Sequence, residues 1–273
     1  NDNATQAEFL EWIHRLRDEG YPCDVYVFDY GWRGDVNVTR EQYSAGQKWG
    51  NQMWSNDTTK FPDIAAMFEE ARQLGFHVGL HNNAGTPEAG GGKMLFKPPY
   101  SDRWVKSYMD SVITTGYGDF FWPDEFDVLG SNTAPVFAAL GAYEAWKAYT
   151  DASRPMFMTR GSYAGHHYAT AWSGDLDASE SDLAYMIGFH IDTGLIGYWA
   201  TSSDLGGFKT RPSNELYTRW VAEFGAWSGM MRTHGHDGRE PWTYDTTAQE
   251  TLKQNLHIRY SLYPFLYTTS WQG

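Results

Sequence analysis

The 273-residue chain has little cysteine and few basic residues, and each shortage excludes a class of protein. Cys23 is the only cysteine, so no disulfide can form within the chain and no zinc site can be built from cysteine pairs. Lys and Arg total 21 against 34 Asp and Glu, which gives a net charge of −13. This balance argues against a nucleic-acid partner and against attraction to an anionic membrane surface.

The sequence also lacks long apolar runs and the short motifs of several enzyme classes. No run of about 18 apolar residues exists, so no membrane insertion is expected. The segment "GTPEAGGGK" lacks the spacing of a dinucleotide-binding turn, and no G-x-S-x-G serine motif occurs. The paired histidines in "GHHY" and "HGHD" do not have the helical spacing of a zinc protease. We therefore expect no catalytic metal.

Apolar and aromatic residues, in contrast, are plentiful. Apolar residues make up 41% of the chain, enough for a sizeable core, and there are 13 Trp, 18 Tyr and 15 Phe. Aromatic rings fill cores well, and their faces also stack on sugar rings. Composition alone leaves both interpretations open.

Strand-like and helix-like patterns alternate along the whole chain. Helices are predicted over 6–19, 62–75, 101–116, 134–152, 180–194, 214–228 and 247–271. Strands are predicted over 24–32, 76–83, 117–126, 154–161, 167–175, 195–204 and 229–235. Such alternation indicates an α/β protein with parallel βαβ units, and seven strands with seven helices favour a (β/α)8 TIM barrel. An open doubly wound sheet is the alternative, disfavoured because no Gly-rich phosphate turn follows a strand.

The barrel interpretation predicts more chain before residue 1. A (β/α)8 barrel opens with a strand, whereas this sequence opens with the helical pattern of residues 6–19. We therefore expect the first strand to be missing, and we interpret residues 1–273 as a single (β/α)8-type domain excised from a longer chain.

Polar or charged residues end each of the seven predicted strands. In a parallel barrel, the functional site lies at the carboxyl ends of the strands, so these side chains should share a pocket. The candidates are Asp29 with Trp32, His81, Asp124 with Glu125, Arg160, Trp172 with Asp175, Asp204, and Arg232 with His234. Several carboxylates with an arginine, a histidine and tryptophans suit glycoside hydrolysis, which needs one acid as nucleophile or base and another as proton donor.

Eight ordered motifs resemble glycoside hydrolase family 31. They are "VFDYGW", "KFPD", "FFWPDEF", "TRGSYAG", "AWSGD", "SDLGGF", "ELYTRWVAEFGAWSGMMRTHG" and "RYSLYPFLYT", which together span nearly the whole chain. The resemblance implies that Asp124 is the nucleophile and Asp175 the general acid/base. It further implies that the sugar is held by Asp29, Arg160, Trp172, Asp204 and His234. Trp32, His81 and Glu125 are expected to be further substrate contacts, from their places at strand ends.

The sequence departs from the family pattern directly after the nucleophile. The family usually has Asn-Glu where this chain has Phe126 and Asp127, so Asp127 would replace the glutamate and Glu125 would be an extra contact. The stretch between Asp124 and Asp175 is also short for the family. Both differences suggest a subgroup away from ordinary α-glucosidases, acting on α-galactosides or α-N-acetylgalactosaminides.

The resemblance implies a retaining double displacement on the terminal α-linked sugar of an oligosaccharide or glycoconjugate. The two catalytic carboxyl groups should then stand about 5–5.5 Å apart. A transglycosylase or lyase that uses the same covalent intermediate, or a carbohydrate-binding barrel without catalysis, fits the sequence as alternatives. The resemblance also implies flanking β-sandwich domains in the full-length protein and no cofactor.

Overall fold

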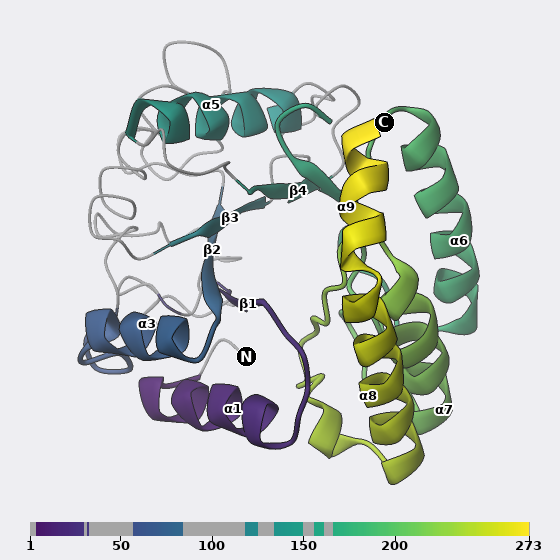
Figure 1. The fold of residues 1–273 in the computed structure, drawn as a ribbon, viewed down its shortest axis with the longest axis horizontal. Coiled ribbons are helices and arrows are strands. Elements are labelled where there is room, and N and C mark those ends of the chain that lie inside the picture. Colours follow the sequence, from purple (N-terminus) through teal and green to yellow (C-terminus); the bar gives the residue numbers. More distant parts are fainter. Residues whose placement is uncertain are drawn as a thin grey trace, which may run out of the picture. The chain divides into compact units, whose positions relative to one another are not determined.

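The computed structural model describes residues 4–29, 32, 57–83, 118–124, 134–149, 156–160 and 166–272 (Figure 1). The chain divides into two compact units. The N-terminal unit comprises residues 2–15 and 23–169, and the C-terminal unit comprises residues 1, 16–22 and 170–273.

The N-terminal unit contains a parallel sheet in the order β1 (Val25–Phe28), β2 (His77–Asn83) and β3 (Phe120–Asp124). Phe28 pairs with Leu80, and Asn83 pairs with Asp124, so the carboxyl ends of the strands meet at one edge. β4 (Met158–Arg160) follows in the chain, and Phe157 just before it forms a parallel bridge to Phe121. This register brings the polar residues at the strand ends together, as the alternating pattern predicts.

The helices described for the N-terminal unit are α1 (Gln6–Asp18), α3 (Ile64–Gln73) and α5 (Ala134–Tyr149). α3 begins where the Asp63 carboxylate accepts a hydrogen bond from the backbone N–H of Ala66, as expected for a helix cap. It ends at Gln73, and the chain turns away at Gly75, whose φ of 77° favours glycine. Both α1 and α3 run alongside β1 and β2 (Figure 1), and Phe9 and Phe68 from these helices pack on the ring of Phe28.

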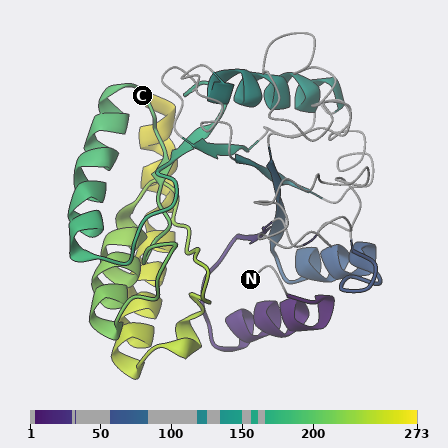
Figure 2. The ribbon, with the colours of Figure 1, turned by 180° about the vertical axis from the view of Figure 1, so that it is seen from behind.

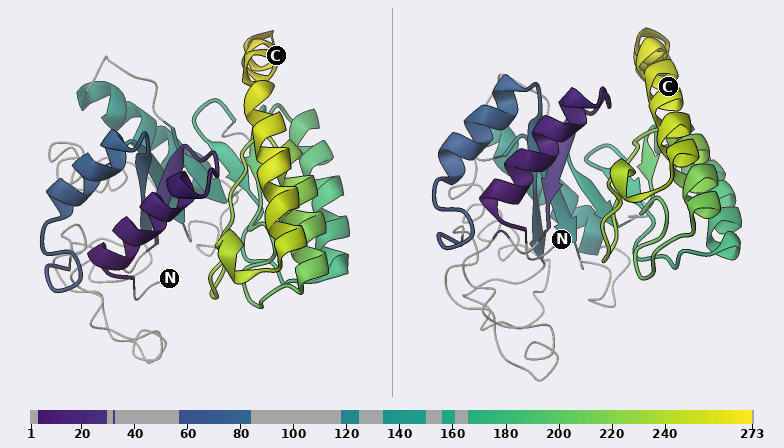
Figure 3. Two further views of the ribbon diagram at one scale, coloured as in Figure 1. Left: turned by 60° about the horizontal axis from the view of Figure 1, so that its bottom comes forward. Right: turned by 90° about the horizontal axis from the view of Figure 1, so that it is seen from below.

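The C-terminal unit contains the parallel pair β5 (Thr170–Trp172) and β6 (Thr201–Ser202). Its helices are α6 (Glu180–Leu195), α7 (Asn214–Tyr217), α8 (Thr246–Ser261) and α9 (Tyr263–Gln272), and α8 leads directly into α9 (Figure 2 and Figure 3). α7 continues as a π-helix over Thr218–Phe224 and a 3-10 turn over Gly225–Trp227, and a second 3-10 turn spans Pro241–Thr243. The core between these elements is built on Trp220, Tyr217 and Leu252.

Four predicted elements differ from the structure. Of the strand predicted over 195–204, only Thr201–Ser202 is a strand, and Leu195 still belongs to α6. Residues 229–235 form no strand beyond a single bridge between Thr233 and Leu205. The helix predicted over 247–271 breaks at Leu262, because Pro264 has no N–H to donate and its ring crowds the preceding turn. The segment predicted as one α-helix over 214–228 changes to π and 3-10 geometry after Tyr217.

The described helices and strands do not test two further predictions. The helix predicted over 101–116 lies outside the described residues. The strands among the described residues form no closed barrel, so the strand expected before residue 1 stays a prediction.

Candidate active site

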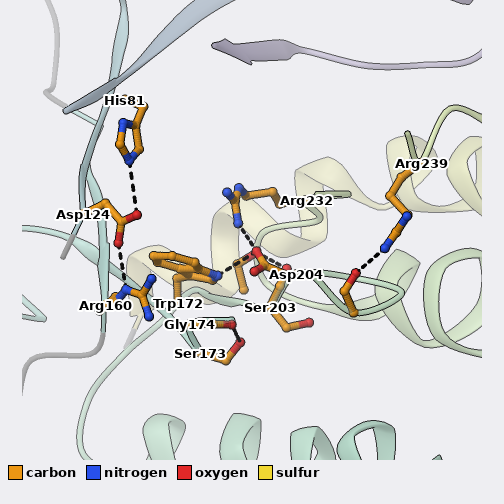
Figure 4. Close-up of polar contacts among 12 residues, drawn as sticks. His81, Asp124, Arg160, Trp172, Ser173, Gly174, Ser203, Asp204, Arg232 and Arg239 are labelled. Carbon is orange, nitrogen blue, oxygen red and sulfur yellow. Dashed lines mark hydrogen bonds and ion pairs between the residues drawn. The ribbon is translucent and has the colours of Figure 1, made fainter. Parts of the chain in front are cut away.

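In the N-terminal unit, the carboxylate of Asp124 is held at the end of β3 by two basic side chains (Figure 4). Arg160, at the end of β4, donates from Nε to Oδ1 of Asp124 over 2.7 Å. His81 of β2 places Nε2 3.1 Å from the other oxygen, Oδ2. Each oxygen of this buried carboxylate therefore has its own partner, which fixes the orientation of the group.

The environment of Asp124 keeps this carboxylate ionised. Burial raises its pKa, but the hydrogen bond and charge of His81 and the charge and hydrogen bond of Arg160 outweigh burial and lower the pKa to about 2. An ionised, oriented carboxylate at a strand end has the properties that a nucleophile requires.

Asp29 and Trp32 meet the same cluster through His81. The Nδ1 atom of His81 lies 3.7 Å from Oδ1 of Asp29, which follows β1. The indole N–H of Trp32, which is buried, donates to the backbone carbonyl of His81 over 3.1 Å. The imidazole also meets the ring of Trp122 edge-on, with the ring centroids 4.5 Å apart. Four candidates from three predicted strand ends are thus brought together with Asp124: Asp29, Trp32, His81 and Arg160.

Glu125, the remaining sequence candidate from this unit, lies outside the described residues. The proposal that it contacts substrate stays a prediction.

In the C-terminal unit, a second cluster forms around Asp204, directly after β6 (Figure 4). The indole N–H of Trp172 donates to Oδ1 of Asp204 over 2.8 Å. The guanidinium of Arg232 pairs with the same oxygen and lies over the Trp172 ring, 5.1 Å from its centroid. Oδ2 of Asp204 has no hydrogen-bond partner in the described part of the chain, and the residue is 0% exposed.

Burial dominates the ionisation of Asp204. It raises the pKa of this carboxyl to about 7; the charge of Arg232 opposes the rise, and the nearby charge of Asp175 adds to it. Asp175 follows Gly174, whose φ of 82° requires glycine at the turn after β5. The predicted acid/base residue thus lies close enough to Asp204 for the two carboxyl groups to affect each other.

His234 is placed by a ring stack in the same unit. Its imidazole stacks on Phe208 with a centroid distance of 5.0 Å and an interplanar angle of 23°. Phe208 also packs against His236, at 4.3 Å between ring centroids. The loop that follows Asp204 therefore supports His234.

Arg232 stands at a predicted strand end without an assigned role, and Phe208 is not among the sequence candidates. Arg232 stands two positions before His234 in "MMRTHG", and its charge within an apolar segment was a usable signal. Phe208 closes the motif "SDLGGF" but has no polar group, so a search for polar residues at strand ends passes over it.

The described residues provide neither a metal site nor a membrane span. Across residues 4–272, omitting the gaps in the description, no group of three His, Cys, Asp or Glu side chains could hold a metal ion. In the same ranges, no helix is both long enough and apolar enough to cross a bilayer.

Comparison with known proteins assigns the family. A family model described as "Glycosyl hydrolases family 31 TIM-barrel domain" matches residues 1–131 and 124–269. The chain belongs to glycoside hydrolase family 31. This family 31 domain is 25% identical over 317 residues to an α-xylosidase of Saccharolobus solfataricus, covering 98% of the chain and 41% of the relative. It is 34% identical over 298 residues to the lysosomal α-glucosidase of Rattus norvegicus, covering 96% of the chain and 30% of that relative.

Solved structures support the barrel fold of the family 31 domain. A mutant of the Flavobacterium johnsoniae GH31 dextranase FjDex31A complexed with isomaltotriose superposes with a TM-score of 0.83 at 18% identity. The match covers 99% of this chain and 40% of the dextranase. The chain thus spans less than half the length of these relatives.

Proposed function

We propose that this chain bears the active site of a retaining, exo-acting α-glycoside hydrolase that removes terminal α-linked sugars. An oxygen of Asp124 attacks the anomeric carbon while Asp175 gives its proton to the leaving oxygen, and the glycosidic bond breaks. Asp175 then takes a proton from a water molecule, which attacks the same carbon and releases Asp124. Two inversions restore the α configuration, and no cofactor is needed.

The observation that supports this proposal most directly is the state of Asp124. Both carboxylate oxygens have a basic partner, and the pKa of about 2 keeps the group anionic at any pH where a glycosidase works. A nucleophile must be oriented as well as ionised, and a separate partner on each oxygen fixes the plane of this carboxylate. The names of the relatives, an α-xylosidase and an α-glucosidase, agree with chemistry at an α-linked anomeric carbon.

The second cluster suits the binding of sugar hydroxyls. Asp204 has one oxygen fixed by Trp172 and Arg232, and the other oxygen makes no hydrogen bond to described residues. A buried acceptor of this kind can accept a hydrogen bond from a sugar hydroxyl in a dry site, where the bond orients the ring strongly. We assign Asp29, Arg160, Trp172, Asp204 and His234 to the sugar bound for cleavage, with His81 and Trp32 supporting them.

The test uses the complete protein and p-nitrophenyl α-glycosides of glucose, galactose, xylose and N-acetylgalactosamine. We expect turnover of one of these, with α-configured sugar as the first product seen by NMR. A 5-fluoroglycosyl fluoride of the same sugar should trap a glycosyl ester on Asp124, identified by peptide mass spectrometry. A β-configured first product, or a label on another residue, would overturn the assignment. Transfer products or an unsaturated sugar would replace hydrolysis by transglycosylation or elimination.

A further inference from the structure

A pocket of about 640 Å³ lies in the C-terminal unit at the amino-terminal side of β6. Its walls include Tyr198, Trp199 and Thr201 at the start of β6, and Trp227, Ser228 and Gly229 after the 3-10 turn. Asp204 follows Thr201 by three residues, which separates them by about 10 Å along an extended chain. Catalytic sites of barrels lie at the other ends of the strands, so this pocket is distinct from the Asp204 cluster.

Two tryptophans give the pocket exposed aromatic faces. Trp199 is 61% exposed and Trp227 is 60% exposed, although both line the same pocket. Tryptophan is normally well buried, and two exposed indoles at one concavity are typical of a binding site. Phe224, half-buried, adds a third ring to the lining.

The wall that presents Trp227 is fixed by a buried arginine. Arg259 of α8 donates from Nη1 to the carbonyls of Ala226 and Ser228, at 2.9 and 2.6 Å, and from Nη2 to that of Gly229 at 3.0 Å. A side chain at Gly229 would come within 2.8 Å of the Ala200 backbone, so this wall lies tightly against the start of β6. The pocket therefore needs little ordering when a ligand binds.

The polar groups of the pocket favour a neutral ligand. Arg219 is already paired with Glu180 and Glu215, and the exposed Glu223 makes no ion pair with any described residue. His190 contacts Thr201 Oγ1 through Nδ1, and burial lowers its pKa, so its imidazole is uncharged near neutral pH. With Glu223 unneutralised, an anionic ligand would be repelled, while hydroxyl groups could donate to this carboxylate.

We propose that this pocket is a second carbohydrate site that binds a neutral α-linked oligosaccharide, with sugar rings stacked on Trp199 and Trp227. The apolar faces of pyranose rings match the exposed indole faces, and Glu223 and Arg219 supply hydrogen-bond partners for the hydroxyls at the rim. The choice of α-linked sugar rests on the proposed function, whereas the stacking on tryptophan does not. Such a site would hold a longer substrate on the protein while its end is processed elsewhere.

The experiment counts binding sites on the complete protein with Asp124→Asn, so that substrate is not consumed. Isothermal titration with isomaltotriose and maltotetraose should give two sites per chain, one of them weak. Adding Trp199→Ala and Trp227→Ala should remove the weak site and leave the other unchanged. The matched control is Trp271→Ala, because Trp271 is 72% exposed on α9 and does not line the pocket. Melting curves by circular dichroism establish that each variant is folded.

The outcomes separate this proposal from the proposed function. Loss of one site in the double variant but not in the control supports the pocket, even if the glycoside panel shows no turnover. The proposal would be overturned if the Trp199→Ala, Trp227→Ala variant and the Trp271→Ala control both kept two sites. It would also be overturned if the protein had a single site that the changes at Trp199 and Trp227 leave intact. If Trp199→Phe with Trp227→Phe restores the weak site, the aromatic faces are responsible. If the weak site stays absent, stacking is the wrong explanation.

Discussion

Asp124 and Asp204 are both buried aspartates paired with an arginine, yet their pKa values move in opposite directions. The carboxylate of Asp124 divides its partners, with Arg160 on one oxygen and His81 on the other. In Asp204, by contrast, Trp172 and Arg232 both contact the same oxygen, and the second oxygen has no hydrogen-bond partner among the described residues. The charge of Asp175 also lies nearby. Burial raises the pKa of both carboxyl groups. At Asp124 the two basic partners outweigh burial and lower the pKa to about 2, whereas at Asp204 burial outweighs Arg232, Asp175 adds to the rise, and the pKa reaches about 7.

The difference shows that an arginine beside a buried acid does not determine its ionisation. What decides is whether both oxygens are satisfied and whether a second acid adds negative charge. The N-terminal cluster is organised to keep an anion ready for attack. The C-terminal cluster leaves one oxygen of Asp204 without a partner among the described residues, near Asp175, which suits the recognition of a hydroxyl group.

The largest effect is expected from Asp124→Asn, which removes the negative charge of this side chain but keeps the size of the side chain. The amide cannot form a glycosyl ester, so kcat/KM should fall by about 10⁴-fold or more, as for other lost nucleophiles. Steady-state rates on the preferred p-nitrophenyl glycoside measure this loss. The introduced amide could deamidate slowly, so mass spectrometry must accompany the assay. A loss of less than tenfold with the amide intact would contradict the nucleophile assignment.

Asp175→Ala should lower activity for a different reason, because it removes the proposed proton donor. Without a proton donor, cleavage of a natural disaccharide should slow by about 10²–10⁴-fold, whereas a glycosyl fluoride needs less help and should slow less. Azide, which needs no general base, should attack the glycosyl ester and give the α-glycosyl azide. Asp124→Ala is the matched control and should give no α-glycosyl azide. Near wild-type rates of Asp175→Ala on the disaccharide would contradict the acid/base role.

Much of the N-terminal cluster could be predicted from the sequence, because its members stand at strand ends and parallel pairing brings those ends to one edge. The register of β2 with β3 sets His81 opposite Trp122 and Asn83 opposite Asp124. The ordered motifs likewise predicted the family. Strand lengths were less predictable: residues 229–235 look apolar and strand-like, yet they form one bridge and contribute Arg232 as a buried partner of Asp204.

The role of Arg232 could not be predicted, because no spacing rule connects it with Asp204, 28 positions earlier. Periodicity indicates which residues are buried, but it does not indicate which buried acid pairs with which buried base. The pocket at Trp199 and Trp227 was also missed, since exposed aromatics look like core residues in a sequence.

Removing the cation from the Asp204 cluster should lower the free energy of unfolding, so this change is measured by stability and not by activity. Measured above about pH 8, where Asp204 with its folded pKa of about 7 is ionised beside Arg232, Arg232→Met breaks a buried ion pair, which costs about 3–5 kcal/mol. Urea unfolding measures the loss. Adding Asp204→Asn to Arg232→Met removes the acid that has lost its cation and should recover part of the lost stability. If the double variant is no more stable than Arg232→Met, the pairing of these two residues is not what stabilises the unit.

The smallest effect is a pair of opposite pH slopes in stability. Asp204 has a folded pKa of about 7, above the unfolded value of about 3.9, so the folded state binds more protons between these limits and stability falls as pH rises from 4 to 7. Asp124 has a folded pKa of about 2, so its contribution is present above pH 4 and is lost as pH falls toward 2. Each slope is at most about 1.4 kcal/mol per pH unit.

Because the two windows meet near pH 4 without overlapping, single variants can separate them. Asp204→Asn should flatten the curve of unfolding free energy between pH 4 and 7 and leave the acid side unchanged. Asp124→Asn should do the reverse, flattening the curve below pH 4. Urea titrations at half-unit pH intervals provide both curves. An unchanged slope between pH 4 and 7 in Asp204→Asn would mean that Arg232 outweighs burial, and that the two clusters hold their carboxylates in the same ionised state.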